Sequence, residues 1–320
     1  MINNRLSYEW CKKDITKGYI LALIGVLTIS TDTLLIKLVD DNVDIWVLIF
    51  YRYLLYFSAS FLYNLYKQKS KIFSEIYNLG YQGLLALCML TICNICFTMS
   101  IDNIGVSSTL SIYAISPIMT SLFSWISFKQ KMFIWTKLIL FLVSGLIIIS
   151  NIFSVRNDNI ILNDIGYLYA NCAMITTSIY FTLLRYNRVN NPEKKMVLVT
   201  FLSALTTTII SLMAINNYDR LHISKANLYW LIIQGILVLP ISFICFTNST
   251  KYITGSESNM ILILEIVLAP VWVYLAGLES PTKVLVICLA IIVTLLLINS
   301  ILSIKYTNTE TDVETDVENN

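Results

Sequence analysis

Long apolar stretches separated by short polar clusters run along almost the whole chain. Ten of these stretches approach or exceed the roughly 20 residues that a helix needs to cross the hydrocarbon core of a bilayer. The pattern therefore predicts an all-α membrane protein with ten transmembrane helices. We expect these helices at 18–39, 43–66, 80–100, 107–128, 134–152, 164–184, 196–215, 228–247, 257–277 and 283–304.

The composition agrees with this pattern and excludes a water-soluble protein. Apolar residues make up 57% of the chain and charged residues 13%, against about 25% charged residues in a typical soluble domain. The net charge is only +2, and the Lys and Arg residues lie in short clusters between apolar stretches, which is unlike a nucleic-acid-binding surface. We therefore expect the lipid bilayer as the surroundings, and no nucleic acid as a partner.

The loop charges predict the orientation, because Lys and Arg resist translocation across the membrane. When alternate loops are grouped, 16 of the 22 Lys and Arg residues share one side with both termini and 5 lie on the other side. We therefore expect a multi-pass protein of the plasma membrane (the inner membrane of a bacterium) with both termini in the cytoplasm. The segments 1–17 and 305–320 are the predicted cytoplasmic tails, and 153–163 is a predicted external linker. The acidic 305–320 is too polar to pack and is expected to be disordered.

The two halves of the chain share a set of residues at a nearly constant spacing. Cys96, Phe97, Thr98, Ser100 and Ile104 recur 149 positions later as Cys245, Phe246, Thr247, Ser249 and Ile253, and Gly18, Tyr19 and Ala22 recur 148 positions later as Gly166, Tyr167 and Ala170. These identities predict two repeats, 18–152 and 164–304, with five helices each. Five is an odd number, so equivalent helices would cross the membrane in opposite directions. Inverted repeats of this kind are typical of secondary transporters, although a duplicated bundle without transport activity is the alternative.

Three ionisable residues lie well inside predicted helices: Asp32, Arg52 and Glu265. Each costs about 2.5 to 3.5 kcal/mol at a helix centre, so such residues usually face the bundle interior or a wet cavity. Asp32 and Arg52 lie roughly 10 and 13 Å from the outer face at 1.5 Å per residue, which permits an ion pair. Such a pair either contacts the substrate or fixes the packing of two helices. Glu265 suits proton coupling or binding of a substrate ammonium group, with a protonated carboxyl group bonded within the bundle as the alternative.

Further candidates rest on polarity and on helix geometry. Prolines inside helices remove a backbone donor and produce kinks or hinges, which are expected at Pro117, Pro240 and Pro270. Polar side chains in apolar helices are candidates for the lining of a substrate path, and these are Asn94, Tyr113, Asn171, Gln234 and Asn259. No metal site and no cofactor is expected.

The residues around these positions resemble the drug/metabolite transporter superfamily, specifically its EamA type, over about 18–304. In the first half the resemblance rests on Arg52 in the second helix and on the run 101–128 with Pro117. In the second half it rests on Glu265, Pro270, Trp272 and Glu279. The chain departs from the family pattern at Gln130, where the family more often has glutamate. The resemblance implies ten helices in two five-helix repeats, with both ends in the cytoplasm.

The function predicted from these features is secondary transport of a small organic metabolite by alternating access. One deep cation and two deep acids favour an amino-acid-like, zwitterionic or cationic solute, with protons as a possible coupling ion. A nucleotide-driven pump is disfavoured because the chain has no GxxxxGK[ST] motif. The alternatives are an intramembrane enzyme, for which the acid–base inventory is poor, and an ion channel, which would need a carbonyl-lined or charged pore.

Overall fold

The computed structural model describes most of the predicted helices. It covers residues 2–40, 42–68, 76–128, 164–190, 196–215, 223–249 and 255–278, together with 138, 142, 221, 252–253 and scattered positions between 286 and 298. Apart from those isolated positions, the predicted helices 134–152 and 283–304, the linker 153–163 and the tail 305–320 lie outside the described residues.

All regular secondary structure in the described part of the chain is helical. The elements are α1 (Ile2–Ile29), α2 (Asp32–Leu38), α3 (Ile45–Gln68), α5 (Gly80–Tyr113), α6 (Ser116–Phe128), α8 (Asp164–Asn190), α9 (Val197–Ala214), α10 (Lys225–Ile232), the π-helical η3 (Ile233–Val238), α11 (Leu239–Ser249) and α12 (Gly255–Leu275). Eight of the ten predicted spans coincide with these helices, and the count of ten stays a prediction.

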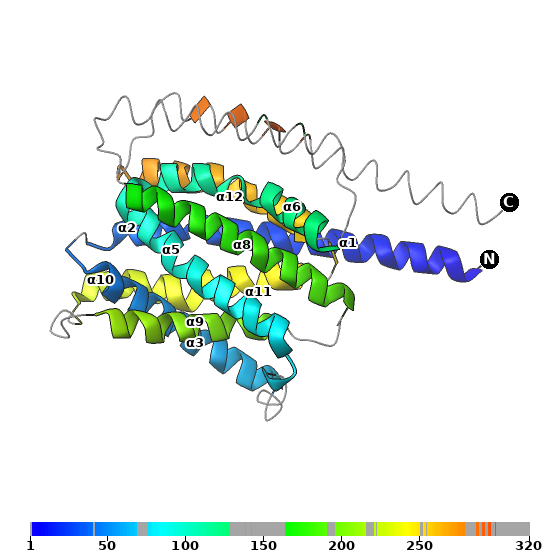
Figure 1. Cartoon of the computed structure of the whole chain (residues 1–320), viewed down its shortest axis with the longest axis horizontal. Helices are drawn as coiled ribbons and strands as arrows, with labels where there is room; N and C mark the ends of the chain where they lie inside the picture. The colour runs from blue at the N-terminus through cyan, green and yellow to red at the C-terminus, as the bar shows by residue number, and fades with distance from the viewer. Residues whose placement is uncertain are drawn as a thin grey trace.

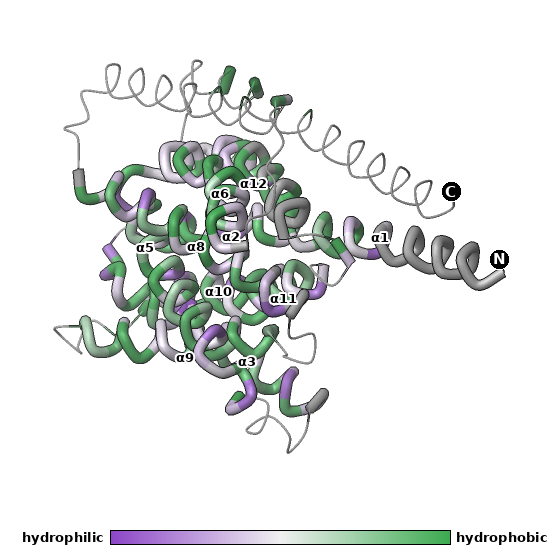
Figure 2. Tube along the Cα trace, turned by 45° about the vertical axis from the view of Figure 1, so that its right-hand side comes forward, coloured by the Kyte–Doolittle hydropathy of each residue, from purple (hydrophilic) through white to green (hydrophobic). Residues whose placement is uncertain are grey.

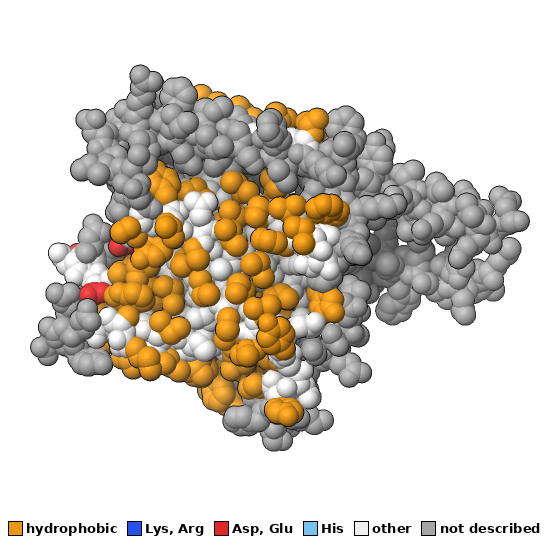
Figure 3. Space-filling model, in the orientation of Figure 1, with side chains coloured by type: hydrophobic (Ala, Val, Ile, Leu, Met, Phe, Trp, Pro, Cys, Tyr) orange, Lys and Arg blue, Asp and Glu red, His pale blue; other side chains and the backbone are white. Residues whose placement is uncertain are grey.

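The helices pack side by side into one bundle, from which α1 projects at the N-terminus (Figure 1). Within the described residues, five helical segments are long and apolar enough to cross a membrane: Thr16–Leu38, Ile45–Tyr66, Gly80–Tyr113, Val197–Ala214 and Lys225–Ser249. Hydrophobic residues predominate along these segments (Figure 2). They also cover the middle of the face seen in Figure 3, where acidic side chains appear only at one end. A surface with this distribution fits a lipid environment.

The first predicted span, 18–39, coincides with the membrane-length segment Thr16–Leu38, but the helix there starts earlier than predicted and is interrupted by a turn. Helix α1 begins at Ile2, since neither Gly nor Pro interrupts the chain before Gly18. It ends at Ile29, and a turn at Ser30 and Thr31 precedes α2. The hydroxyl groups of Ser30 and Thr31 donate to backbone carbonyls three residues earlier, which competes with a regular helical ladder. Asp32 therefore occupies the first position after a helix break.

The predicted helix 107–128 is also interrupted. Helix α5 runs through to Tyr113 with a kink at Gly105, whose φ is +79°, and a turn at 114–115 separates it from α6. Pro117 lies in the first turn of α6 rather than deep inside a helix. Its backbone has no N–H to donate to the Tyr113 carbonyl four residues earlier, so the helix ends at Tyr113.

The two prolines of the second half lie in different settings. Pro240 is the second residue of α11, which follows η3, so this part of the span combines a π-helical turn with a missing backbone donor. Pro270 lies inside α12 and is buried. The predicted kink or hinge at each position is a prediction about motion that the fold leaves untested.

Helix packing joins the two halves in matched pairs. Helix α5 packs against α8 as α1 packs against α11, α6 packs against α8 as α1 packs against α12, and α3 packs against α9. If the helices that the predicted repeat makes equivalent are exchanged, each of these contacts is converted into its counterpart. The glycines of the predicted repeat make contacts that are related in the same way. A Cβ atom on Gly18 would lie 2.8 Å from Ile253, and one on Gly166 would lie 2.5 Å from Ile104.

Candidate functional site

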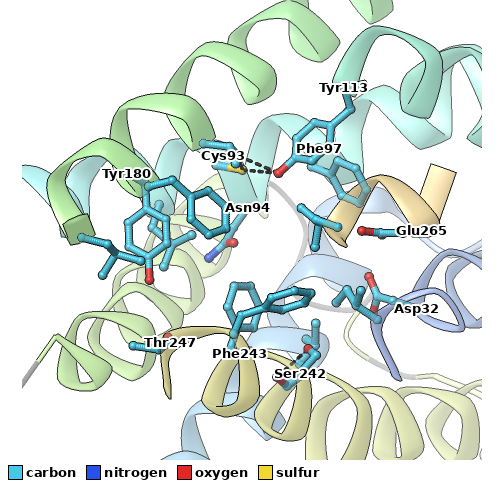
Figure 4. A pocket seen from close by; sticks show the side chains of 18 of the residues that line it. Asp32, Cys93, Asn94, Phe97, Tyr113, Tyr180, Ser242, Phe243, Thr247 and Glu265 are labelled. Carbon is cyan, nitrogen blue, oxygen red and sulfur yellow. Dashed lines mark hydrogen bonds between the residues drawn. The ribbon is translucent and has the colours of Figure 1, made fainter. Parts of the chain in front are cut away.

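A cavity lies inside the bundle, between helices of the first half (α1 to α5) and helices of the second half (α8, α11 and α12) (Figure 4). The empty space between its side chains, including the open mouth, is about 740 Å³. Its lining residues are Ile29, Asp32, Arg52, Tyr53, Leu90, Cys93, Asn94, Phe97, Tyr113, Thr177, Tyr180, Phe181, Leu184, Leu239, Ser242, Phe243, Phe246, Thr247, Leu262 and Glu265.

The ion pair that the matching depths of Asp32 and Arg52 permit is present, between Arg52 Nη2 and Asp32 Oδ2. Both side chains are almost fully buried, with exposed fractions of 2% for Arg52 and 1% for Asp32. Arg52 also donates from Nη1 to the Thr98 hydroxyl at 2.7 Å, and its guanidinium lies 5.0 Å from the ring centroid of Tyr53. The pair thus joins α2, α3 and α5.

Gln234 supports this pair from the second half. Its Nε2 donates to the second carboxylate oxygen of Asp32 at 2.9 Å and to the Asp32 backbone carbonyl at 3.1 Å. Gln234 lies in η3, next to Gly235, where a Cβ atom would be 2.8 Å from the backbone oxygen of Arg52. The absence of a side chain at Gly235 allows η3 to approach α3 closely and brings the Gln234 amide to Asp32. Gln234 was expected in the lining, but it is not among the lining residues and instead bonds to Asp32, which is.

Glu265 differs from Asp32 in having no described partner. Its side chain is 4% exposed and lines the cavity from α12, next to Asp32 and across from Tyr180 (Figure 4). No hydrogen bond joins its carboxyl group to any side chain or backbone group in the described part of the chain. The cavity therefore contains one acid that is neutralised by an arginine and one acid that is not.

A hydrogen-bonded cluster closes the contact between α5 and α8 at the cavity wall. The hydroxyl groups of Tyr113 and Thr177 lie 2.7 Å apart, and the Cys93 thiol also bonds to Thr177. Cys93 lines the cavity and takes part in this hydrogen-bonded cluster. Tyr113 lines the cavity as its polarity predicted.

Aromatic rings form much of the remaining wall. The rings of Phe97 and Tyr113 lie 5.3 Å apart, and those of Tyr180 and Phe181 lie 5.6 Å apart. Phe243 stacks on Tyr56 behind the cavity at 5.5 Å. Sequence reasoning missed these aromatic residues, because aromatic side chains in an apolar helix look the same whether they face lipid or a cavity. The repeated Cys-Phe-Thr motif was the available signal, since both of its phenylalanines, Phe97 and Phe246, line the cavity.

The other predicted lining residues have mixed outcomes. Asn94 lines the cavity and donates to the Thr207 hydroxyl at 3.4 Å. Asn171 does not line it, since it lies on the exposed face of α8 and donates to the Tyr167 carbonyl of its own helix at 2.9 Å. Polarity alone did not reveal which face of α8 the residue occupies. The side chains of Asn259 and Pro117 lie outside the described residues.

Both halves line the cavity with residues at the spacing of the predicted repeat. At a spacing of 149, Leu90, Cys93, Asn94, Phe97 and Tyr113 correspond to Leu239, Ser242, Phe243, Phe246 and Leu262. At a spacing of 148, Ile29 and Asp32 correspond to Thr177 and Tyr180. The cavity is therefore centred where the two halves meet.

These features define a multi-pass membrane protein with a cavity that is lined by residues of both halves. Residues 16–152 match the model of the EamA-like transporter family. This matched segment, which is less than half of the chain, is similar to EamA-type transporters of the drug/metabolite transporter superfamily. A solved crystal structure superposes with a TM-score of 0.63 at 14% identity, covering 90% of this chain and 98% of that one, which supports the fold alone. Curated proteins give no match.

Proposed function

We propose that this transporter is a secondary carrier that moves a small organic solute across the plasma membrane by alternating access. The observation that carries the proposal is the cavity between the two halves, lined at equivalent positions and holding buried charges. A site placed between two halves becomes open to either side when one half rocks against the other. The cavity thus serves as the substrate site of the carrier.

The proposal includes two inverted five-helix repeats, 18–152 and 164–304. It is supported by the paired helix contacts and by the reciprocal glycine contacts, Gly18 with Ile253 and Gly166 with Ile104. Two similar folds in opposite orientations have two conformations of similar energy, open to opposite sides. The loop charges favour a cytoplasmic location for both termini. The solute is amino-acid-like, zwitterionic or cationic, and protons are the proposed coupling ion.

Counterflow in proteoliposomes tests the carrier. Purified protein is first screened by thermal shift against amino acids, nucleosides and amines, because a ligand of the folded state stabilises it by mass action. Vesicles preloaded with an unlabelled hit should accumulate the labelled compound transiently and with saturation. An imposed pH gradient should raise that accumulation, and an ionophore that collapses the gradient should remove the increase.

The same vesicle experiment distinguishes the carrier from a channel and from an enzyme, because each would give a different result. Conductance far above carrier rates without counterflow would indicate a channel. Chemical conversion of the hit, detected by mass spectrometry, would indicate an enzyme. Counterflow that is unaffected by the ionophore would retain the carrier and remove protons as the coupling ion.

A further inference from the structure

The ionisable groups of the cavity carry an unequal charge. Three lining residues belong to the types that are charged near neutral pH, namely Asp32, Arg52 and Glu265. The other lining groups that titrate are thiol or phenol groups, which are ordinarily neutral there. With both acids ionised, one cation faces two anions, and the described lining has a net charge of −1.

The cation of the cavity is already engaged. Arg52 binds Asp32 and Thr98, and the second oxygen of Asp32 accepts from Gln234. The remaining nitrogen, Nε, has no partner among described groups and is itself buried. A substrate carboxylate would have to displace Asp32 from Arg52 and leave a buried carboxylate without its cation, which is strongly unfavourable. The arrangement therefore opposes binding of anions and of zwitterions through Arg52.

Glu265, the acid without a described partner, favours binding of a cation. Glu265 is 4% exposed, faces the cavity and receives no hydrogen bond from the described part of the chain. Its position beside Asp32 adds a second negative group to the same wall (Figure 4). A buried carboxylate without a partner is costly unless a cation or a donor reaches it. An ammonium group supplies both, with a positive charge and up to three N–H donors.

The rest of the wall fits an apolar body. Tyr53, Phe97 and Tyr113 belong to the first half, and Tyr180, Phe181, Phe243 and Phe246 to the second. Aromatic faces attract cations and also pack against apolar groups. A ligand that places its charged nitrogen at Glu265 can extend its carbon skeleton across these rings.

We propose that the solute is a monocationic amine with an apolar or aromatic body, whose ammonium group binds Glu265. The inference deepens the proposed carrier function and narrows its substrate class, because it selects the cation over the zwitterion. The Asp32–Arg52 pair then acts as a neutral, fixed part of the wall.

A matched ligand series tests the charge preference directly. Phenethylamine, phenylalanine, 3-phenylpropionate and 2-phenylethanol share an aromatic ring and differ in the charge of the head group. Binding to the purified full-length protein is measured by thermal shift and by calorimetry. Phenethylamine should bind at least tenfold more tightly than phenylalanine and the alcohol, and the anion should bind most weakly. Equal or tighter binding of phenylalanine overturns the proposal, as does equal binding of the alcohol or no binding of any member of the series.

Variants locate the preference at Glu265. Glu265→Gln should lose at least tenfold in phenethylamine affinity and should no longer distinguish the amine from the alcohol. Glu265→Asp keeps the charge and should retain the preference for the amine with weaker binding, which separates loss of charge from misfolding. Asp102→Asn removes an exposed acid outside the cavity and should bind as the parent does. A Glu265→Gln protein that folds and keeps the parental amine affinity overturns the assignment.

Counterflow separates this inference from the carrier function. Binding with the predicted preference but without phenethylamine counterflow would contradict the carrier and leave the charge preference standing. Counterflow of phenylalanine in preference to phenethylamine would contradict the charge preference and leave the carrier standing.

Discussion

The two halves of the chain place equivalent residues around the cavity but give them different chemistry. Asp32 of the first half corresponds to Tyr180 of the second, and Asn94 corresponds to Phe243. The first half contributes the ion pair and an amide, while the second contributes mostly rings and hydroxyl groups. Helix packing conserves the positions of the wall and leaves the side chains free to differ. Positions that the predicted repeat makes equivalent thus carry different chemistry at the site.

The helices that form the cavity walls also differ between the two halves, because they are interrupted at different positions. Ser30 and Ser178 are equivalent, yet the chain turns at Ser30 between α1 and α2 and continues through Ser178 within α8. The first half also breaks at 114–115, between α5 and α6. The second half contributes η3, whose Gln234 bonds to Asp32 of the first half. Irregular backbone in a membrane protein is tolerated where neighbouring groups satisfy it, and here it lies close to the polar wall.

Among the substitutions considered, removal of Arg52 from the polar wall of the cavity should have the largest effect on stability. Arg52→Met leaves the buried Asp32 without its cation, which typically costs about 3 to 5 kcal/mol. Chemical denaturation of the protein in detergent micelles measures the change. The double variant Arg52→Met with Asp32→Asn removes both charges and should recover most of the loss. A single variant as stable as the parent would show that Asp32 does not depend on Arg52.

Substitution of Gly18 and Gly166 tests whether the two halves of the chain pack in corresponding ways. Alanine at Gly18 or Gly166 puts a methyl group within 2.8 Å of Ile253 or Ile104, respectively. Overpacking costs about 1 to 3 kcal/mol, and the higher helix propensity of alanine offsets about 1 kcal/mol of it, so we expect each variant to lose up to about 2 kcal/mol by denaturation, and the two losses to be similar.

Gly25 is the matched control for this pair. A Cβ atom there lies 3.1 Å from the Phe246 ring, which is a movable side chain, so Gly25→Ala should change stability less. Clearly unequal losses at Gly18 and Gly166 would argue against equivalent packing of the two halves.

The sequence predicts the symmetric features of this molecule better than the asymmetric ones. Apolar runs of about 20 residues are a strong signal, so eight spans were placed on described helices. The Asp32–Arg52 pair could be predicted because the depth of both residues in the membrane is counted from the same face. The break at Ser30 was not, because serine and threonine hydroxyls also bond to carbonyls inside continuous helices. The face on which Asn171 lies depends on tertiary packing, which composition does not encode.

The paired serines provide the finest test of the comparison. Ser30 accepts a hydrogen bond from Trp272 Nε1 at 3.2 Å, whereas Ser178 donates to the Ser116 carbonyl at 3.0 Å. Hydrogen bonds between helices in membranes contribute about 0.6 kcal/mol on average. Ser30→Ala and Ser178→Ala should each lose about that amount in the same denaturation assay, although one removes an acceptor and the other a donor.

A double-mutant cycle shows whether the two serines act through these bonds. Trp272→Phe removes the donor to Ser30, so adding Ser30→Ala to it should cost less than Ser30→Ala does in the parent. Adding Ser178→Ala to Trp272→Phe should cost its full amount, because the Ser178 bond joins α8 to α6 and does not involve Trp272. Coupling of Trp272 to Ser178 as strong as its coupling to Ser30 would contradict separate contacts at the two equivalent positions. The expected result is that the stability losses add for Ser178 and Trp272 but do not add for Ser30 and Trp272. This result would show that the two corresponding serines are held by different hydrogen bonds.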